Sequence, residues 1–181
     1  MPTTVEDFIK MLNNYIEDAK ILRQIHQNKT FRNKKFNTRH TVITIIISSF
    51  LSLLGFRGLE SIRQVFNLTK EHQIRALEFV FSILIFLFFI LAILKLVFRF
   101  EEKYNHHSRS VVILSGFIRD IKDIILMNEF EERQFKNINK EIRERYKMIT
   151  EILPPSSDKE HRIAKEDYFK KKLEKEKLNK S

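Results

Sequence analysis

Few residues of this 181-residue chain have the types and spacing that chemistry requires. His106 and His107 are adjacent, but neighbouring residues of a helix point to different sides, so they do not favour a shared metal ion. The glutamates within residues 131–144 alternate with Lys and Arg, which is the pattern of a solvated helix face. The chain has no cysteine, which excludes a thiolate nucleophile, a thiolate metal site and a disulfide.

Sequence motifs for nucleotide binding and covalent catalysis are missing as well. The chain has neither a GxGxxG nor a GxxxxGK[ST] phosphate-binding loop, and no serine lies in a nucleophile elbow. We therefore predict that the protein is not an enzyme and that it uses no metal and no cofactor.

The polar residues with the most informative spacing lie inside an apolar run. Thr41, Thr44, Ser48 and Ser52 recur at intervals of three or four residues, so they form one stripe on a helix, which Gly55 extends. In lipid, such a stripe either packs closely against another helix or lines a water-filled pore of an oligomer. The sequence leaves both interpretations open, and the two can coexist if several first spans meet around an axis.

Two apolar runs must position this stripe. The run "FVFSILIFLFFILAIL", residues 79–94, is apolar on every side, and its extension to residues 76–98 gives a helix of about 34 Å. The run "TVITIIISSFLSLLGF", residues 41–56, also lacks charge and is about 24 Å long. Because a core helix needs a polar face or a large domain around it, we predict two transmembrane helices.

The basic residues predict the orientation in the membrane. The net charge is +10, and nine Lys and Arg residues flank the outer ends of the two runs, whereas four lie between the runs. Both termini are therefore expected in the cytoplasm, with the protein in the inner membrane. The residues expected to contact lipid headgroups are Lys34, Lys35, Arg39, Lys95 and Arg99. The basic and aromatic segment 29–39 fits such an interfacial anchor, with nucleic-acid binding as the less favoured alternative.

The remaining sequence predicts an all-α protein in three parts. Residues 1–40 form an amphipathic cytoplasmic helix over 2–28, with Thr3 and Glu6 as a capping box, followed by a basic linker. Residues 41–98 form the two-span hairpin, joined by an amphipathic connector over 57–75. Residues 99–181 form a cytoplasmic helical bundle.

Two helices are expected in the last part. The first is a single long helix over residues 108–153 that continues from the second span and ends before Pro154 and Pro155. Ser157 and Glu160 then form a capping box at the start of a final helix over 158–178. The apolar face of this helix consists of Ile163, Ala164, Tyr168 and Leu173.

The long helix carries one strongly apolar face. The residues that recur on it at helical spacing are Phe135, Ile138, Ile142, Tyr146 and Ile149. Because a monomer would not expose such a face to water, we predict that it is the interface of a homo-oligomer.

This layout resembles the SLATT family, the two-span effectors that associate with SMODS nucleotidyltransferases and SLOG nucleotide sensors in prokaryotes. The resemblance covers most of the chain, and its most specific part is "YKMITEILPPSSDKEHRIA", residues 146–164. It implies a membrane effector of antiviral, abortive-infection defence that permeabilises the inner membrane. It also implies a sensor partner encoded nearby, such as a nucleotidyltransferase or a reverse transcriptase.

Two other functions fit the same residues. A holin-like protein also forms membrane lesions from a small basic two-span chain, although holins carry little soluble mass and this chain has more than eighty residues after its second span. A non-conducting membrane anchor would instead use its helical bundle to recruit a soluble partner. Growth arrest with dye entry on expression separates the lesion formers from the anchor.

Overall fold

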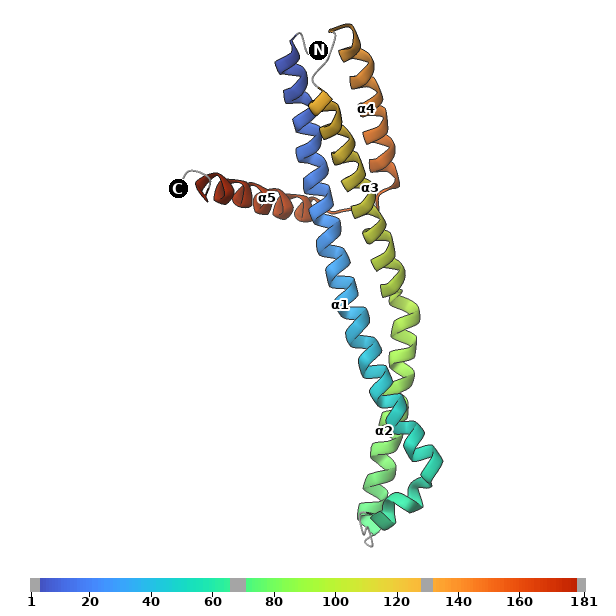
Figure 1. Cartoon of the computed structure of the whole chain (residues 1–181). Helices are drawn as coiled ribbons and strands as arrows, with labels where there is room; N and C mark the ends of the chain where they lie inside the picture. Colours follow the sequence, from blue (N-terminus) through green and yellow to red (C-terminus); the bar gives the residue numbers. More distant parts are fainter. Residues whose placement is uncertain (1–3, 66–70, 128–131, 179–181) are drawn as a thin grey trace. The chain divides into compact units, whose positions relative to one another are not determined.

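The computed structural model describes residues 4–65, 71–127 and 132–178, and all the regular secondary structure within them is helical. The helices are α1 (Val5–Val65), α2 (Glu71–Phe98), α3 (Phe100–Met127), α4 (Glu132–Ile152) and α5 (Asp158–Leu178) (Figure 1). The predicted all-α class is confirmed. The helices divide into two compact units, the first made of residues 1–31 and 103–181 and the second of residues 32–102.

Local signals mark several helix ends. The Thr4 Oγ1 accepts a hydrogen bond of 3.2 Å from the Asp7 amide, so Thr4 caps α1. The capping box predicted one residue earlier, at Thr3, falls partly outside the described residues. At the other end of the chain, the Ser157 amide donates to Glu160 (2.9 Å) and the Glu160 amide donates to the Ser157 hydroxyl (3.3 Å). This is the predicted capping box, and α5 has the predicted bounds of 158–178.

Two predicted helix boundaries were wrong. The basic segment 29–39 is not a linker but lies within α1, which runs from residue 5 to 65. The single helix predicted over 108–153 is instead two helices, α3 and α4. Neither Gly nor Pro separates these two helices in the sequence, so no local signal marks their boundary.

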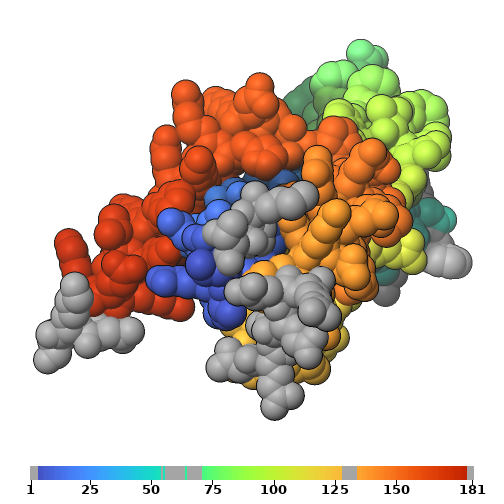
Figure 2. Space-filling model, turned by 90° about the horizontal axis from the view of Figure 1, so that it is seen from above, coloured from blue at the N-terminus to red at the C-terminus, as the bar shows by residue number. Residues whose placement is uncertain are grey.

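The first unit is a bundle in which residues 5–31 of α1 lie beside α3 and α4 (Figure 1). Phe8 on α1 stacks on Phe135 of α4 with ring centroids 4.6 Å apart, and Phe117 of α3 stacks on Tyr146 at 5.5 Å. Seen from above, the first turns of α1 lie next to α4, and α5 extends along one side (Figure 2). The apolar side of the amphipathic helix predicted over residues 2–28 is therefore its core face.

The predicted oligomer interface is corrected by this packing. Phe135, Ile142 and Ile149 are buried in the core of the single chain, and Ile138 and Tyr146 are half-buried against it. The face is as apolar as the sequence indicates, but α1 and α3 of the same chain cover it. Its hydrophobicity therefore provides no argument for self-association, and its buried members are not available to a second copy.

The fifth helix contacts the bundle through a smaller face than predicted. Ala164 is buried and Tyr168 is half-buried, whereas Ile163 and Leu173 are exposed. Lys172 pairs with Glu17 of α1. A single buried residue means that α5 gains little from apolar burial and depends on polar contacts.

The second unit contains residues 32–65 of α1 together with α2. His40 on α1 donates from its Nε2 to the carbonyl oxygen of Leu91 on α2 at 2.9 Å, so the start of the first apolar run lies beside the end of the second. No residue of α2 is buried. The connector predicted at 57–75 lies mostly outside the described side chains.

A one-residue break separates α2 from α3. Arg99 has a φ of +44°, in the left-handed region that side chains other than glycine rarely adopt. In a continuous helix, residues two apart point to opposite sides. Here Phe98 and Phe100 stack with ring centroids 5.4 Å apart, because the left-handed residue turns them to the same side. Phe36 of α1 adds a ring at 6.0 Å from Phe100.

Candidate functional site

Two features of the described residues are candidates for function: the apolar surface of the second unit and a buried histidine pair in the first. The apolar surface centres on α2. One helical stretch, Glu71–Met127, contains a segment apolar enough to cross a membrane, with a mean hydropathy of 3.0 and none of that segment buried. The predicted second span lies in this stretch. The first run is not among the candidate spans of the described residues, and the side chains of Leu54 and Phe56 lie outside them.

The residues of the predicted polar stripe differ in their exposure to solvent. Thr41, Thr44 and Ser48 are half-buried, whereas Ser52 and Gly55 are exposed. The Thr44 hydroxyl donates to the His40 carbonyl oxygen at 2.8 Å, and the Ser48 hydroxyl donates to the Ile45 carbonyl oxygen at 3.0 Å. Such bonds to the preceding turn satisfy hydroxyls in an apolar medium without a partner helix or water.

The five predicted headgroup residues are exposed. Lys34, Lys35 and Arg39 precede the first apolar run on α1, whereas Lys95 lies in the last turn of α2 and Arg99 directly follows that helix. The contact between His40 and Leu91 brings these two ends of the unit together. All five cations therefore lie at one end of the helix pair, which is where a headgroup layer would meet them.

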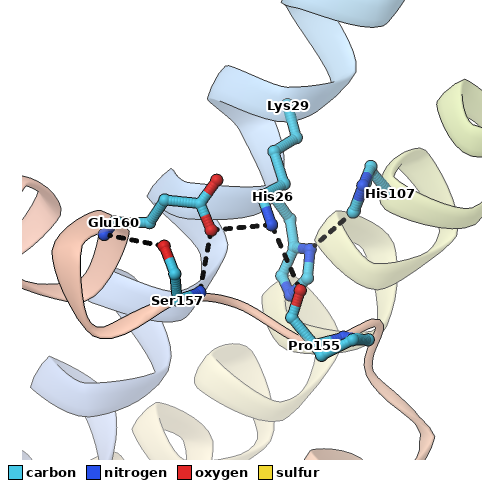
Figure 3. Close-up of polar contacts among 6 residues, drawn as sticks. All are labelled: His26, Lys29, His107, Pro155, Ser157 and Glu160. Carbon is cyan, nitrogen blue, oxygen red and sulfur yellow. Dashed lines mark hydrogen bonds and ion pairs between the residues drawn. The ribbon is translucent and has the colours of Figure 1, made fainter.

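The buried pair consists of His26 on α1 and His107 on α3, which are 1% and 9% exposed. Their Nδ1 atoms are 3.0 Å apart, so one ring donates to the other (Figure 3). The Nε2 of His26 is buried and has no hydrogen-bond partner among the described residues. His26 follows Leu22 by one helical turn and so continues the apolar core face of α1.

Residues 153–160 comprise the connection between α4 and α5 and the first three residues of α5; they lie next to this pair and are called the elbow here. Lys29, one turn beyond His26, reaches across to it in two ways (Figure 3). Its Nζ donates to the Pro155 carbonyl oxygen at 3.2 Å and pairs with the Glu160 carboxylate at 2.8 Å. Because Glu160 also caps α5 through Ser157, one carboxylate connects the start of α5 to α1.

The surroundings shift two ionisation equilibria at this site. Burial, reinforced by His107 and Lys29, lowers the pKa of His26 to about 4, with Glu160 opposing the shift. Partial burial alone would raise the pKa of Glu160, but Lys29 and the amide and hydroxyl of Ser157 outweigh it and lower that pKa to about 2. At pH 7, His26 is therefore neutral and Glu160 is ionised.

Neither a metal ion nor an anion is a good occupant for the described part of the first unit. Within it, no three His, Asp or Glu side chains could hold a metal together, and Lys29 would repel a cation at the histidine pair. A hollow of about 700 Å³ lies beside Tyr15 and Tyr146. Two of the cations at its edge, Lys140 and Lys147, are already paired with glutamates on α4, which reduces its attraction for anions.

The sequence singled out His106 and His107 but not His26 or Lys29. The contact between His26 and His107 joins residues 81 positions apart, so no pattern of neighbouring residues predicts it. One signal in the sequence could have identified His26. A histidine that continues an apolar stripe is expected in the core, where its ring nitrogens need hydrogen-bond partners. The structure places His106 on the exposed side of α3, so the two adjacent histidines are separated as predicted.

Comparisons with known proteins add no relative. No family model, no curated protein and no solved structure matches the chain.

Proposed function

We propose that this chain is a two-span membrane effector of a prokaryotic antiviral defence system, with the first unit and both termini in the cytoplasm. The observation that supports it best is the unburied apolar surface of α2. Phe79, Phe86 and Phe89 are each more than 60% exposed, and α2 has no buried residue. A surface of this size is incompatible with water and is matched by a hydrocarbon core.

The first apolar run supports the proposal that the chain crosses the membrane twice. Its large side chains are exposed in the same way as those of α2; they are Val42, Ile43, Ile45, Ile46, Phe50 and Leu53. A helix with no backbone group left unpaired can accompany α2 through lipid. The resemblance to SLATT proteins supports the role in defence and the association with a nucleotidyltransferase or reverse-transcriptase partner. Permeabilisation of the membrane is the activity that this resemblance implies.

Expression in bacterial cells tests membrane action directly. Induction should arrest growth and admit a DNA-binding dye that intact cells exclude. Phe86→Arg should abolish both effects, because an arginine at the centre of a span costs about 2.5–3.5 kcal/mol of insertion free energy. Phe86→Leu is the matched control and should retain them. Equal toxicity of the two variants would contradict an action that depends on α2 in the membrane.

A non-conducting anchor is the second candidate, and the polar stripe favours it. Thr44 and Ser48 are half-buried and bond to their own helix, which suits dry packing better than the wall of a pore. Ion flux through liposomes containing the purified chain separates the two functions. If the stripe lines a pore, Ser48→Leu with Ser52→Leu should stop the flux while the protein still inserts. If the wild-type chain carries no flux, the anchor function is supported.

A further inference from the structure

The histidine pair has a property that follows from counting hydrogens. Two neutral imidazoles carry two ring hydrogens on four nitrogens. One of these hydrogens lies between the two Nδ1 atoms, because these atoms are at hydrogen-bond distance. If the pair gains one proton and keeps this bond, both Nε2 atoms must carry a hydrogen. This holds whichever ring was the donor at the start.

In the protonated pair, one of these hydrogens therefore lies on the Nε2 of His26. The Nε2 of His26 is buried and lacks a partner among the described residues, so an N–H at this atom is an unsatisfied donor in the core. A second added proton would place hydrogens on both Nδ1 atoms and break the bond between the rings. The protonated pair therefore combines a positive charge in the core with a buried donor that has no acceptor among the described residues, so the surroundings favour the neutral pair.

The groups around His26 determine which contact weakens when the pair is protonated. Lys29 on α1 and His107 on α3 oppose a positive charge at His26, and on α5 His161 opposes it while Glu160 favours it. Lys29 is also the residue that holds the elbow, through Pro155 and Glu160. A charged His26 thus stands next to the ammonium group on which the elbow contact depends.

The element that is easiest to release is α5. It buries only Ala164 and packs a half-buried Tyr168 against the core, and its polar contacts with α1 include the Lys29–Glu160 and Lys172–Glu17 ion pairs and the Lys20 ammonium 5.9 Å from the Tyr168 ring. Segments with few buried apolar contacts open at the lowest free energy. The α1, α3 and α4 helices share the large core and should remain assembled.

We propose that His26 and His107 form a proton-sensitive latch, which holds the elbow and α5 on the bundle at neutral pH and releases them on acidification. The latch does not rest on the proposed membrane activity, because all its residues lie in the first unit. It makes the exposure of one face of the cytoplasmic bundle dependent on pH in the range between 6.5 and 4.

Cysteine labelling of the full chain in lipid nanodiscs tests the latch. The chain has no cysteine, so Ala164→Cys reports on the buried face of α5, which is 2% exposed, and Leu178→Cys, at a site 74% exposed, gives the reference rate. The ratio of the two labelling rates cancels the pH dependence of the thiol. Between pH 7.5 and pH 5.0 this ratio should rise about 3-fold to 30-fold, the upper value applying if His26 becomes fully hydrated on opening.

Variants assign the response to the pair. His26→Gln removes the titrating group, so it should abolish the rise of the ratio on acidification, whatever the value of the ratio at pH 7.5. His107→Gln leaves His26 buried and able to titrate, so it should reduce this rise without abolishing it. His106→Gln, at the adjacent exposed histidine, is the matched control and should retain it. A flat ratio in the wild-type background, or an undiminished rise in His26→Gln, would overturn the latch.

Hydrogen exchange of the chain without the reporter cysteines provides the second measurement. After correction for intrinsic rates, the amides of α5 should lose protection at pH 5.0 while those of α3 keep theirs. Equal loss in α3 and α5 would mean that the pair stabilises the whole bundle, and the proposal of a local release would then be wrong.

Discussion

Ile142 decides whether the apolar face of α4 belongs to the chain's own core or to a second copy. Its side chain is 5% exposed and belongs to a core cluster to which α1 and α3 also contribute. Ile142→Val should lower the free energy of unfolding of the first unit by about 0.5–1.5 kcal/mol, and Ile142→Ala by about 2–5 kcal/mol. Ile142→Asp adds an unpaired buried carboxylate, so its total should approach the 5–15 kcal/mol that is typical of a whole domain.

The assay is hydrogen exchange of the full chain in detergent, combined with its mass by light scattering. Ile142→Asp should remove the protection of α1 and α3 amides, because these helices share the core with α4. Met148→Asp is the matched control on the same helix, at a site 56% exposed, and should change neither protection nor mass. If Ile142→Asp halves the mass but leaves α1 and α3 protected, the face binds another copy and the reasoning fails.

Three further predictions concern other parts of the chain. Arg99→Gly should be about 1 kcal/mol more stable to heat than Arg99→Ala, since both lose the guanidinium but only glycine accepts a φ of +44° without strain; equal melting temperatures would contradict this. The depressed pKa of Glu160 contributes stability that is present above pH 4.5 and lost as the pH falls towards 2, so Glu160→Gln should abolish the loss of α5 protection in that window alone. Reporter fusions after Ser181 should be active only in the cytoplasm, and fusions between Asn67 and Lys70 only outside it; a C-terminal reporter active outside would refute the topology.

The parts of the fold that could be predicted are those written in neighbouring residues. Ser157 and Glu160 cap α5 within one turn, and Pro154 stops α4 without help from the rest of the chain. The apolar run of α2 is equally local, because any helix with that composition needs lipid or a large enclosing domain.

What could not be predicted depends on contacts between distant residues. A helix over residues 108–153 satisfies every local preference, yet the chain gains more by folding α4 back so that Phe135 meets Phe8. The same packing brings His26 to His107 and turns an expected oligomer interface into a core. Arg99 has a left-handed backbone conformation that residues other than glycine rarely adopt. The stacking of the Phe98 and Phe100 rings offsets the cost of this conformation.

Glu160 both caps α5 and pairs with Lys29, so the docking of α5 on α1 and the formation of its first turn depend on the same carboxylate. The carboxylate that caps α5 is the same one that pairs with Lys29, so the cap and the ion pair with α1 reinforce each other. Undocking therefore weakens the helix itself, and a change that unwinds its first turn weakens docking in return. Docking of α5 and folding of its first turn are thus coupled through one side chain, and a partner that binds the undocked segment would meet a first turn that is less firmly held.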